Sequence, residues 1–294
     1  MINPKVKIIT VITVLIVLLL VSVGFNIYLG FFGFDSYLQD TEQIYIMEAG
    51  ILRNNLEFKE GESYETVYDF DNAEYPILIE KYNIDKTAGE GSEFEKAVRL
   101  MNEYAPRLIH ESYYDNHVEM NALSLLEYSL DNSSQGINCR SKAQILNEMC
   151  LALGIYSRKV WIMPNSGYDG DCHVANEIWD SELSKWVMLD ITNNQYWVDE
   201  NATPLSVVEI RTKGANMEFC TPVTAGDNLN GLNKLNEKNI GDFLYIMKNM
   251  MYFYWCDIQT VGETDKKYML FPENLPTNYE LIISLDAYNE SPVV

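Results

Sequence analysis

The spacing of apolar residues changes at Gly154 from a helical period to a period of two, and this change limits the folds open to the chain. Before Gly154 one apolar stripe recurs at helical spacing: Cys139, Ala143, Leu146, Cys150 and Leu153. Gly154 itself stands where a helix end favours a residue of positive φ. After it, β-branched and aromatic residues predict strands at 159–163, 173–179 and 185–191. The pattern therefore predicts an α+β fold, with Cys139 in the first turn of a buried helix.

The last two predicted strands form a hairpin that brings a histidine close to an aspartate. If Trp179 pairs with Ser184 across the turn, His173 falls directly opposite Asp190. Directly paired residues lie on one face of a sheet, with Cβ atoms about 4.5–5.5 Å apart. A register shifted by two residues keeps the pair within diagonal reach, whereas a shift by one puts the two side chains on opposite faces.

A cysteine at a helix N-terminus, within reach of a histidine and an acid, is the arrangement that thiol enzymes use. The thiolate is the nucleophile, and a helix N-terminus and an imidazolium both favour it. The acid orients the imidazole. We therefore predict Cys139, His173 and Asp190 as catalytic residues.

The oxyanion formed by attack on an amide needs hydrogen-bond donors. The backbone N–H of Cys139 is one expected donor. The second is left open among four upstream side chains: Gln135, Asn138, Asn116 and His117.

Cys172, next to His173, raises the alternative of a metal site shared with Cys139. Neighbouring residues of a strand point to opposite faces, so Cys172 and His173 do not readily face the same thiol. We expect neither a metal nor a cofactor. The five cysteines contain no C-x-x-C pair, which argues against a disulfide framework and zinc-finger spacing.

Three segments resemble the motifs of the transglutaminase-like superfamily. Residues 136–139, the helix after them and residues 153–155 resemble its cysteine motif. Residues 172–177 resemble its histidine motif, and residues 185–192 its aspartate motif. The resemblance covers about 92–212 and is closest to bacterial surface and secreted members. It implies a papain-like core with the cysteine at a helix N-terminus packed on an antiparallel sheet, and thiol chemistry on amide bonds of proteins or peptides without a metal.

The sequence departs from the family at two places. Family members often carry an aromatic residue after the histidine, where this chain has Val174 and Ala175, and Ile191 replaces the usual proline of Asp-Pro-Thr. An amine acceptor must compete with water for the thioester, which needs a protected channel. The missing aromatic residue therefore favours hydrolysis over amine transfer. The alternative function is an inactive transglutaminase-like protein that serves as a surface binding or scaffold protein.

The N-terminus contains an uncharged run from Ile8 to Phe34, preceded by Lys5 and Lys7. A helix of this length spans about 40 Å, against a hydrocarbon core of roughly 30 Å. A core helix would show a polar face, and a signal peptide has a shorter apolar region of about 7–15 residues. An uncleaved transmembrane anchor is therefore favoured over a cleaved signal peptide. The preceding lysines place the N-terminus in the cytoplasm and the catalytic domain outside the cell, as a single-pass membrane protein.

The net charge of −22 excludes a nucleic-acid partner, because such proteins need a basic face. The remaining partners are a protein or peptide substrate and the membrane, and the sequence does not indicate an oligomeric state. We predict a cytoplasmic stub and anchor at 1–34, an acidic juxtamembrane region at 35–91, a transglutaminase-like domain at 92–212 and a C-terminal extension at 213–294 that packs on the core.

Two local signals lie before the cysteine helix. Ser92 and Glu95 form a capping box that predicts the start of a helix. Residues 75–79 are expected to be extended, because a residue before proline avoids the helical region.

Overall fold

A computed structural model describes residues 4–28, 41–131, 135–166, 168–224 and 237–293. The chain divides into two compact units, Met1–Met47 and Glu48–Val294, and the boundary falls within helix α3 (Thr41–Arg53).

The first unit contains helix α1 (Pro4–Tyr28). Its segment Thr10–Tyr28 has a mean hydropathy of 2.6, and none of it is buried. By length and composition this segment could cross a membrane as a span or a signal anchor. Residues 29–34 of the predicted anchor lie outside the described residues.

The second unit is built on a seven-stranded sheet with the order β6-β5-β4-β3-β2-β7-β9. All its neighbouring strands pair antiparallel. Its strands are β2 (Ser157–Met163), β3 (His173–Asp180), β4 (Lys185–Asp190), β5 (Gln195–Val198), β6 (Thr221–Thr224), β7 (Tyr252–Cys256) and β9 (Lys267–Leu270). The three strands expected from the sequence are β2, β3 and β4.

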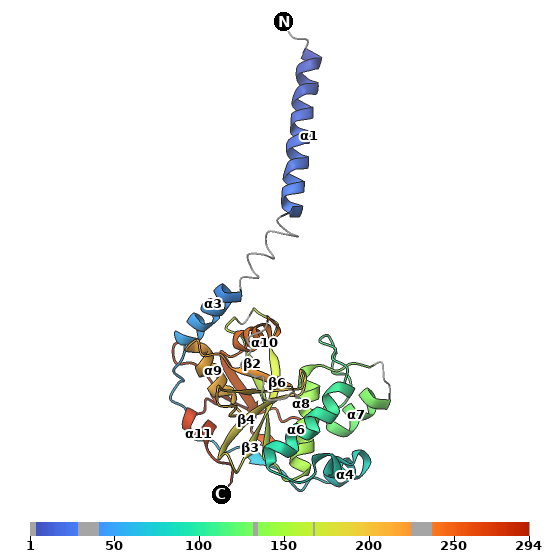
Figure 1. Cartoon of the computed structure of the whole chain (residues 1–294), viewed down its shortest axis with the longest axis vertical. Coiled ribbons are helices and arrows are strands. Elements are labelled where there is room, and N and C mark those ends of the chain that lie inside the picture. The colour runs from blue at the N-terminus through green and yellow to red at the C-terminus, as the bar shows by residue number, and fades with distance from the viewer. Residues whose placement is uncertain (1–3, 29–40, 132–134, 167, 225–236, 294) are drawn as a thin grey trace. The chain divides into compact units, whose positions relative to one another are not determined.

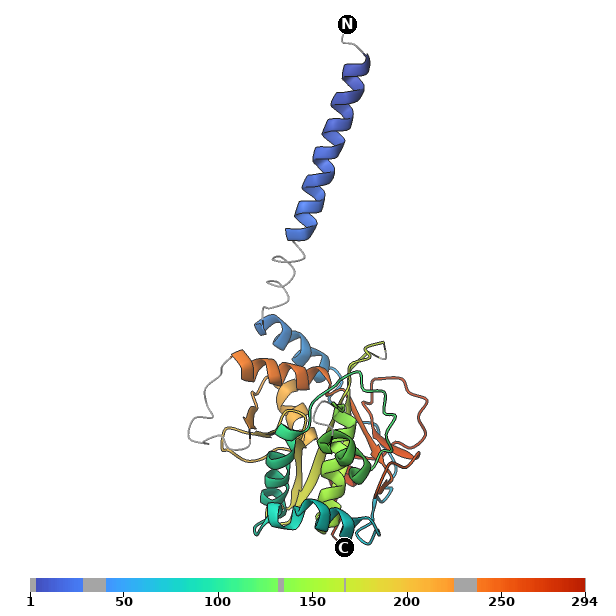
Figure 2. The ribbon, with the colours of Figure 1, turned by 90° about the vertical axis from the view of Figure 1, so that its right-hand side faces the viewer.

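Helices lie on both sides of this sheet (Figures 1 and 2). One side carries α4 (Tyr75–Tyr82), α5 (Ile84–Ala88), α6 (Glu93–Tyr104), the 3-10 turn η2 (Ala105–Arg107), α7 (Ala122–Asp131) and α8 (Cys139–Ala152). The remaining helices are α9 (Val207–Ala215), α10 (Glu237–Lys248) and α11 (Leu285–Asn289). The main core is enclosed between the first helical layer and one face of the sheet. The fold is α+β with an antiparallel sheet, as the sequence predicts.

Helix α8 is buried on more than the predicted stripe. Ala143, Leu146 and Cys150 are fully buried, but so are polar residues of the other face. Gln144 donates to Glu148 at 2.7 Å and to the carbonyl of Gly262 at 2.9 Å. The carboxylate of Glu148 also accepts the backbone N–H of Ala122, at the start of α7, at 2.8 Å. Polar residues can line the outer face because each finds a hydrogen-bond partner there.

The expected extended segment at 75–79 is wrong, because these residues begin α4. Pro76 stands in the first turn of that helix. Proline is tolerated at this position, since the first N–H groups of a helix have no partner within it. The capping box of Ser92 and Glu95 is confirmed at the start of α6. A second, two-stranded parallel sheet joins β1 (Val67–Tyr68) to β8 (Ile258–Gln259).

Candidate active site

Cys139 is the first residue of α8. Asn138 caps this helix: its side-chain oxygen accepts the backbone N–H of Ser141 at 3.0 Å. The Asn138 amide nitrogen donates to Asn116 at 3.1 Å and to the carbonyl of Tyr114 at 3.4 Å. The cap therefore fixes the helix N-terminus against the upstream loop, and the thiol lies where the helix dipole favours negative charge.

His173 begins β3, and Asp190 ends the neighbouring strand β4. The two side chains are bonded, with 2.9 Å between His173 Nε2 and Asp190 Oδ2. They are not directly opposite each other, because Trp179 pairs with Trp186 rather than with Ser184. The expected register is wrong by two residues. The pair is diagonal on one face and still within reach, since a shift of two keeps the face unchanged.

Asp190 is fully buried, and its carboxylate is saturated with donors. Oδ2 also accepts the Asn193 side-chain amide at 2.8 Å, and Oδ1 accepts the backbone N–H of Thr192 at 3.0 Å and that of Asn193 at 3.3 Å. Burial alone would raise the pKa of Asp190. The charge of His173 and these hydrogen bonds outweigh burial and hold the pKa below its ordinary value, so Asp190 is ionised.

The imidazole of His173 lies between this carboxylate and the thiol. Nε2 is bonded to Asp190, and His173 and Cys139 line the same cavity. Burial alone would lower the pKa of His173. The charge of Asp190, its hydrogen bond to the ring and the nearby Cys139 side chain raise the pKa to about 10. The ring is therefore an imidazolium at neutral pH. The structure thus brings together all three residues predicted from the sequence.

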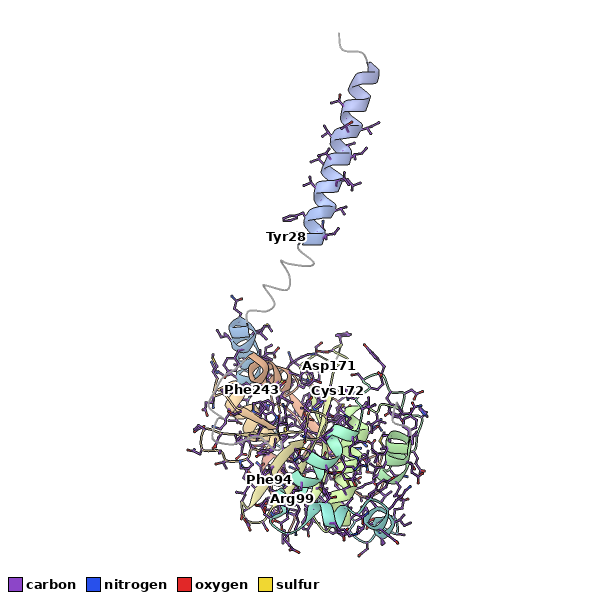
Figure 3. All side chains as sticks on the ribbon, turned by 45° about the vertical axis from the view of Figure 1, so that its right-hand side comes forward. Tyr28, Phe94, Arg99, Asp171, Cys172 and Phe243 are labelled. Carbon is purple, nitrogen blue, oxygen red and sulfur yellow. The ribbon has the colours of Figure 1, made fainter. Side chains whose placement is uncertain are left out.

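Cys139 and His173 open onto a cavity of about 970 Å³. Its wall includes residues from β2, β5, β7 and α10, and from the loops before α8 and β3: His110, Tyr113, Trp161, Asp171, Cys172, Gln195, Asp242, Tyr245 and Tyr254. Asp171 and Cys172 are labelled in Figure 3, directly before β3. A solvent-accessible cavity beside the thiol leaves room for a substrate chain.

Helix α10 completes this cavity from the C-terminal part of the chain. The Tyr245 ring meets the His173 ring edge to face, with centroids 5.7 Å apart. Asp242 accepts the Gln195 side-chain amide at 3.0 Å. Lys248, at the end of the helix, pairs with Asp169 and with Asp171 at 3.0 Å each, which ties α10 to the loop before β3.

The transglutaminase-like superfamily profile matches residues 80–191. This range contains Cys139, His173 and Asp190. Residues 80–191 form a transglutaminase-like domain.

Solved structures with a likeness to this chain include two bacterial proteins. One is a proposed cysteine protease from Cytophaga hutchinsonii, 15% identical with a TM-score of 0.30, over 49% of this chain and 42% of that one. The other is a proposed protease from Parabacteroides distasonis, 14% identical with a TM-score of 0.28, over 49% of this chain and 29% of that one. The chain thus spans less than half the length of either. Comparison with curated proteins gave no match.

The transglutaminase-like domain has an aromatic wall beside Cys139, although no aromatic residue follows His173. Trp161 of β2 pairs with Val174 across the sheet, and its ring stacks on Tyr254 of β7 with centroids 5.0 Å apart. Cys139 packs against the cluster that contains Trp161 and Val174. Strands β2 and β7 thus place aromatic rings near Cys139, although the histidine motif has no aromatic residue after His173. The pairing of β2 with β7 cannot be predicted from the spacing of residues in the sequence.

Of the four side chains considered as second oxyanion donors, Asn138 lines the cavity. Both of its amide donors are used within the loop, on Asn116 and Tyr114. The exposed His117 is bonded to Asp115, and Gln135 accepts from Tyr128 at 2.8 Å. The structure therefore singles out none of the four.

The remaining cysteines of the domain and its extension differ in exposure. Cys172 is half-buried and lines the cavity, whereas Cys150, Cys220 and Cys256 are buried. Burial, with the nearby Cys139, raises the pKa of Cys172. Over the described ranges, no group of three or more His, Cys, Asp or Glu side chains is arranged to hold a metal ion.

Proposed function

We propose that the chain is a thiol enzyme that acts on amide bonds of protein or peptide substrates through Cys139, His173 and Asp190. One observation carries this proposal: His173 is bonded to the buried Asp190 carboxylate and lines the same cavity as Cys139. That is the arrangement of nucleophile, base and orienting acid.

The mechanism follows from these contacts. The thiolate form of Cys139, with its proton on His173, attacks the amide carbonyl carbon. The carbonyl oxygen becomes an oxyanion, and we expect the backbone N–H of Cys139, at the helix N-terminus, to donate to it. The tetrahedral intermediate expels the amine, and His173 gives it the proton. A thioester on Cys139 remains, and His173, now neutral, can act as a base.

Water or an amine then resolves the thioester. Attack by water, with its proton passing to His173, releases a carboxylic acid and completes hydrolysis. We favour hydrolysis, because Val174 and Ala175 stand where many family members carry an aromatic residue after the histidine. The stacked Trp161 and Tyr254 support amine transfer as a second candidate, because an aromatic wall near the thiol lowers the access of water.

The proposed setting is the outer surface of a cell membrane. The apolar segment Thr10–Tyr28 would serve as the anchor. Lys5 and Lys7 before it would hold the N-terminus in the cytoplasm, with the catalytic domain outside.

A peptide library with a labelled amine tests the reaction. The full-length protein in detergent is incubated with glutamine-containing peptides and a labelled primary amine. Hydrolysis predicts cut or deamidated peptides without label, and these products should be absent with the Cys139→Ala variant. Labelled, uncut peptides would instead establish amine transfer. No product of either kind, with an unreactive Cys139, would favour the scaffold function.

A further inference from the structure

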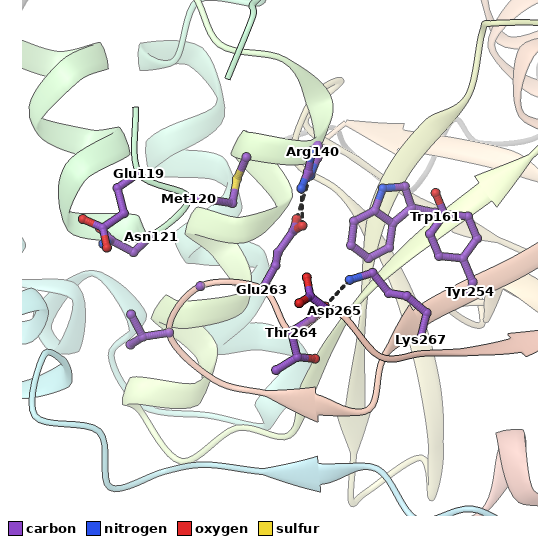
Figure 4. A pocket seen from close by; sticks show the side chains of 12 residues that line it. Glu119, Met120, Asn121, Arg140, Trp161, Tyr254, Glu263, Thr264, Asp265 and Lys267 are labelled. Carbon is purple, nitrogen blue, oxygen red and sulfur yellow. Dashed lines mark hydrogen bonds and ion pairs between the residues drawn. The ribbon is translucent and has the colours of Figure 1, made fainter. Parts of the chain in front are cut away.

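A second cavity of about 650 Å³ adjoins the Cys139 cavity. Figure 4 shows the residues that line this second cavity. Arg140, Trp161 and Tyr254 line both cavities, so the two cavities share one wall. The far side of the second cavity is formed by residues 261–265, after β8, and by Lys267 of β9. Arg140 directly follows Cys139, which places this cavity beside the nucleophile.

Among the described residues, the one acidic side chain in the inner part of the second cavity, Glu263, is already paired with cations. Glu263 accepts Arg140 Nε at 2.8 Å, and its carboxylate is also bonded to Arg140 Nη2 and to the buried Lys159. Burial alone would raise the pKa of Glu263, but Arg140 and Lys159 lower it to about 2, so it is ionised. Its one negative charge thus faces two cations.

Lys267 is a second cation that lines this cavity, beside Arg140. Its ammonium bonds the Thr264 carbonyl, lies 3.3 Å from Cys256 Sγ, and is 5.3 Å from the centre of the Trp161 ring. The Lys159 ammonium is 4.8 Å from the centre of that ring. Two carboxylates at the rim, Glu119 and Asp265, are exposed, so water screens them more than the inner charges.

Arg140 retains a donor for a ligand. Its Nε and Nη2 are used on Glu263, and among the described residues Nη1 has no hydrogen-bond partner. The Arg140 side chain is 39% exposed, so a ligand can approach it. A carboxylate in this cavity could accept a charge-assisted hydrogen bond from Arg140 Nη1 or from Lys267, beside the Trp161 ring.

We propose that the second cavity is a substrate subsite that binds a single carboxylate close to the amide attacked by Cys139. This proposal rests on the function proposed above and names its substrate class: a peptide segment with an acidic residue, or a free C-terminus, near the attacked amide. A polyanionic segment does not fit, because the net charge of −22 repels it at long range. The subsite selects one acidic group within a segment that is otherwise neutral or basic.

Peptide probes test the subsite without requiring turnover. Each probe is a neutral pentapeptide with a chloroacetamide side chain at its centre, and carries either Glu or its isostere Gln at one flanking position. A second pair differs only in a free or an amidated C-terminus. The rate at which each probe modifies Cys139 of the full-length protein is measured by mass spectrometry. At one flanking position at least, the Glu probe should modify Cys139 about tenfold faster than the matching Gln probe. A tenfold ratio corresponds to about 1.4 kcal/mol. The C-terminal pair distinguishes the two sources of the carboxylate.

Two adjacent lysines provide matched variants. Lys267→Gln removes a cation from the subsite and should bring the Glu to Gln rate ratio close to one. Lys266→Gln changes the net charge by the same amount, but Lys266 pairs with Asp257 at 3.6 Å and does not line the cavity. The Glu to Gln rate ratio of this variant should therefore equal that of the unchanged protein. Asp265→Asn, which removes a rim carboxylate, should increase the ratio, and this gain does not depend on how well Lys267→Gln folds.

Three results would overturn the subsite. The first is equal rates for acidic and neutral probes at every position in the unchanged protein. The second is an equal decrease of the Glu to Gln rate ratio in the Lys267→Gln and Lys266→Gln variants. That result would show that the ratio depends only on the net charge of the protein. The third is modification of Cys139 no faster than of Cys172 by every probe, which would also overturn the proposed function, whereas the first two leave it intact.

Discussion

His173 and Asp190 are bonded at 2.9 Å along a diagonal of the β3–β4 hairpin, not across a directly opposed pair. Three further hydrogen bonds hold the carboxylate in place, one from the Asn193 side chain and two from backbone N–H groups of the turn after β4. The orientation of the imidazole therefore depends on the residues after Asp190 as much as on the strand register.

Asp190→Asn should reduce turnover by about 10³–10⁴-fold with little change in the fold. The turn N–H groups require an acceptor at Oδ1, so the new amide nitrogen would face His173 Nε2. A neutral His173 must then accept at Nε2 and carry its proton on Nδ1, where it cannot take the Cys139 proton. Product release from the peptide library measures the loss. Activity within tenfold of the unchanged protein would contradict this role for Asp190.

The pH dependence of stability reports the charge of His173. Its pKa is raised from 6.5 to about 10 in the folded chain, so the folded state holds an extra proton between these values. Its stabilising contribution is complete below about pH 6.5 and is lost as the pH rises through about 10, at ~1.4 kcal/mol per pKa unit.

Urea unfolding of the full-length protein and of its His173→Gln variant from pH 6 to pH 10 measures this contribution. The difference between the two free energies of unfolding should shrink as the pH rises. Lys159, whose pKa burial lowers to about 8, titrates in the same window but is common to both proteins. Parallel curves would show that His173 is not held as an imidazolium.

Tyr245 tests whether the C-terminal extension completes the active site. Its ring packs edge to face on His173, a contact that contributes about 0.5–1.5 kcal/mol. Tyr245→Phe keeps the ring and should retain activity within about threefold, whereas Tyr245→Leu should lose roughly tenfold. The measurement is turnover of the library peptide that reacts fastest. Full activity in the Leu variant would show that α10 is not needed to orient His173.

The candidate active-site residues could be predicted from the sequence because they come from one continuous segment with clear periodicity. The stripe that includes Ala143 and Leu146 marks the α8 helix, and a shift of two residues in the hairpin does not separate His173 from Asp190. Tyr245 and Asp242 were not predictable, because contacts between α10 and the cavity join parts of the chain far apart in sequence. The Trp161–Tyr254 stack depends in the same way on the pairing of β2 with β7.

The polar face of α8 shows a second limit of sequence patterns. Gln144 and Glu148 lie outside the predicted apolar stripe, yet they are buried, because the loop after β8 and the start of α7 supply their partners. Periodicity indicates which face is apolar. It does not indicate that other elements cover the opposite face.

The anchor is tested by adding a protease to intact cells. If the segment Thr10–Tyr28 spans the membrane with the N-terminus inside, the catalytic domain should be degraded, leaving a protected fragment from Met1 to about Asp35. Lysed cells serve as the control for access to the protein. Protection of the full-length chain, or a soluble chain that begins near Phe25, would contradict this topology.

Alkylation of the cysteines by iodoacetamide tests the thiol site most directly. Cys139 and Cys172 are both partly exposed, so Cys172 is an internal control for access. At pH 7 Cys139 should be modified fastest of the five, His173→Ala should slow it at least tenfold, and Cys172 should react slowly in both proteins because its pKa is raised. Equal rates at Cys139 and Cys172, or an unchanged rate at Cys139 without His173, would contradict the proposal that these residues form a catalytic thiol site.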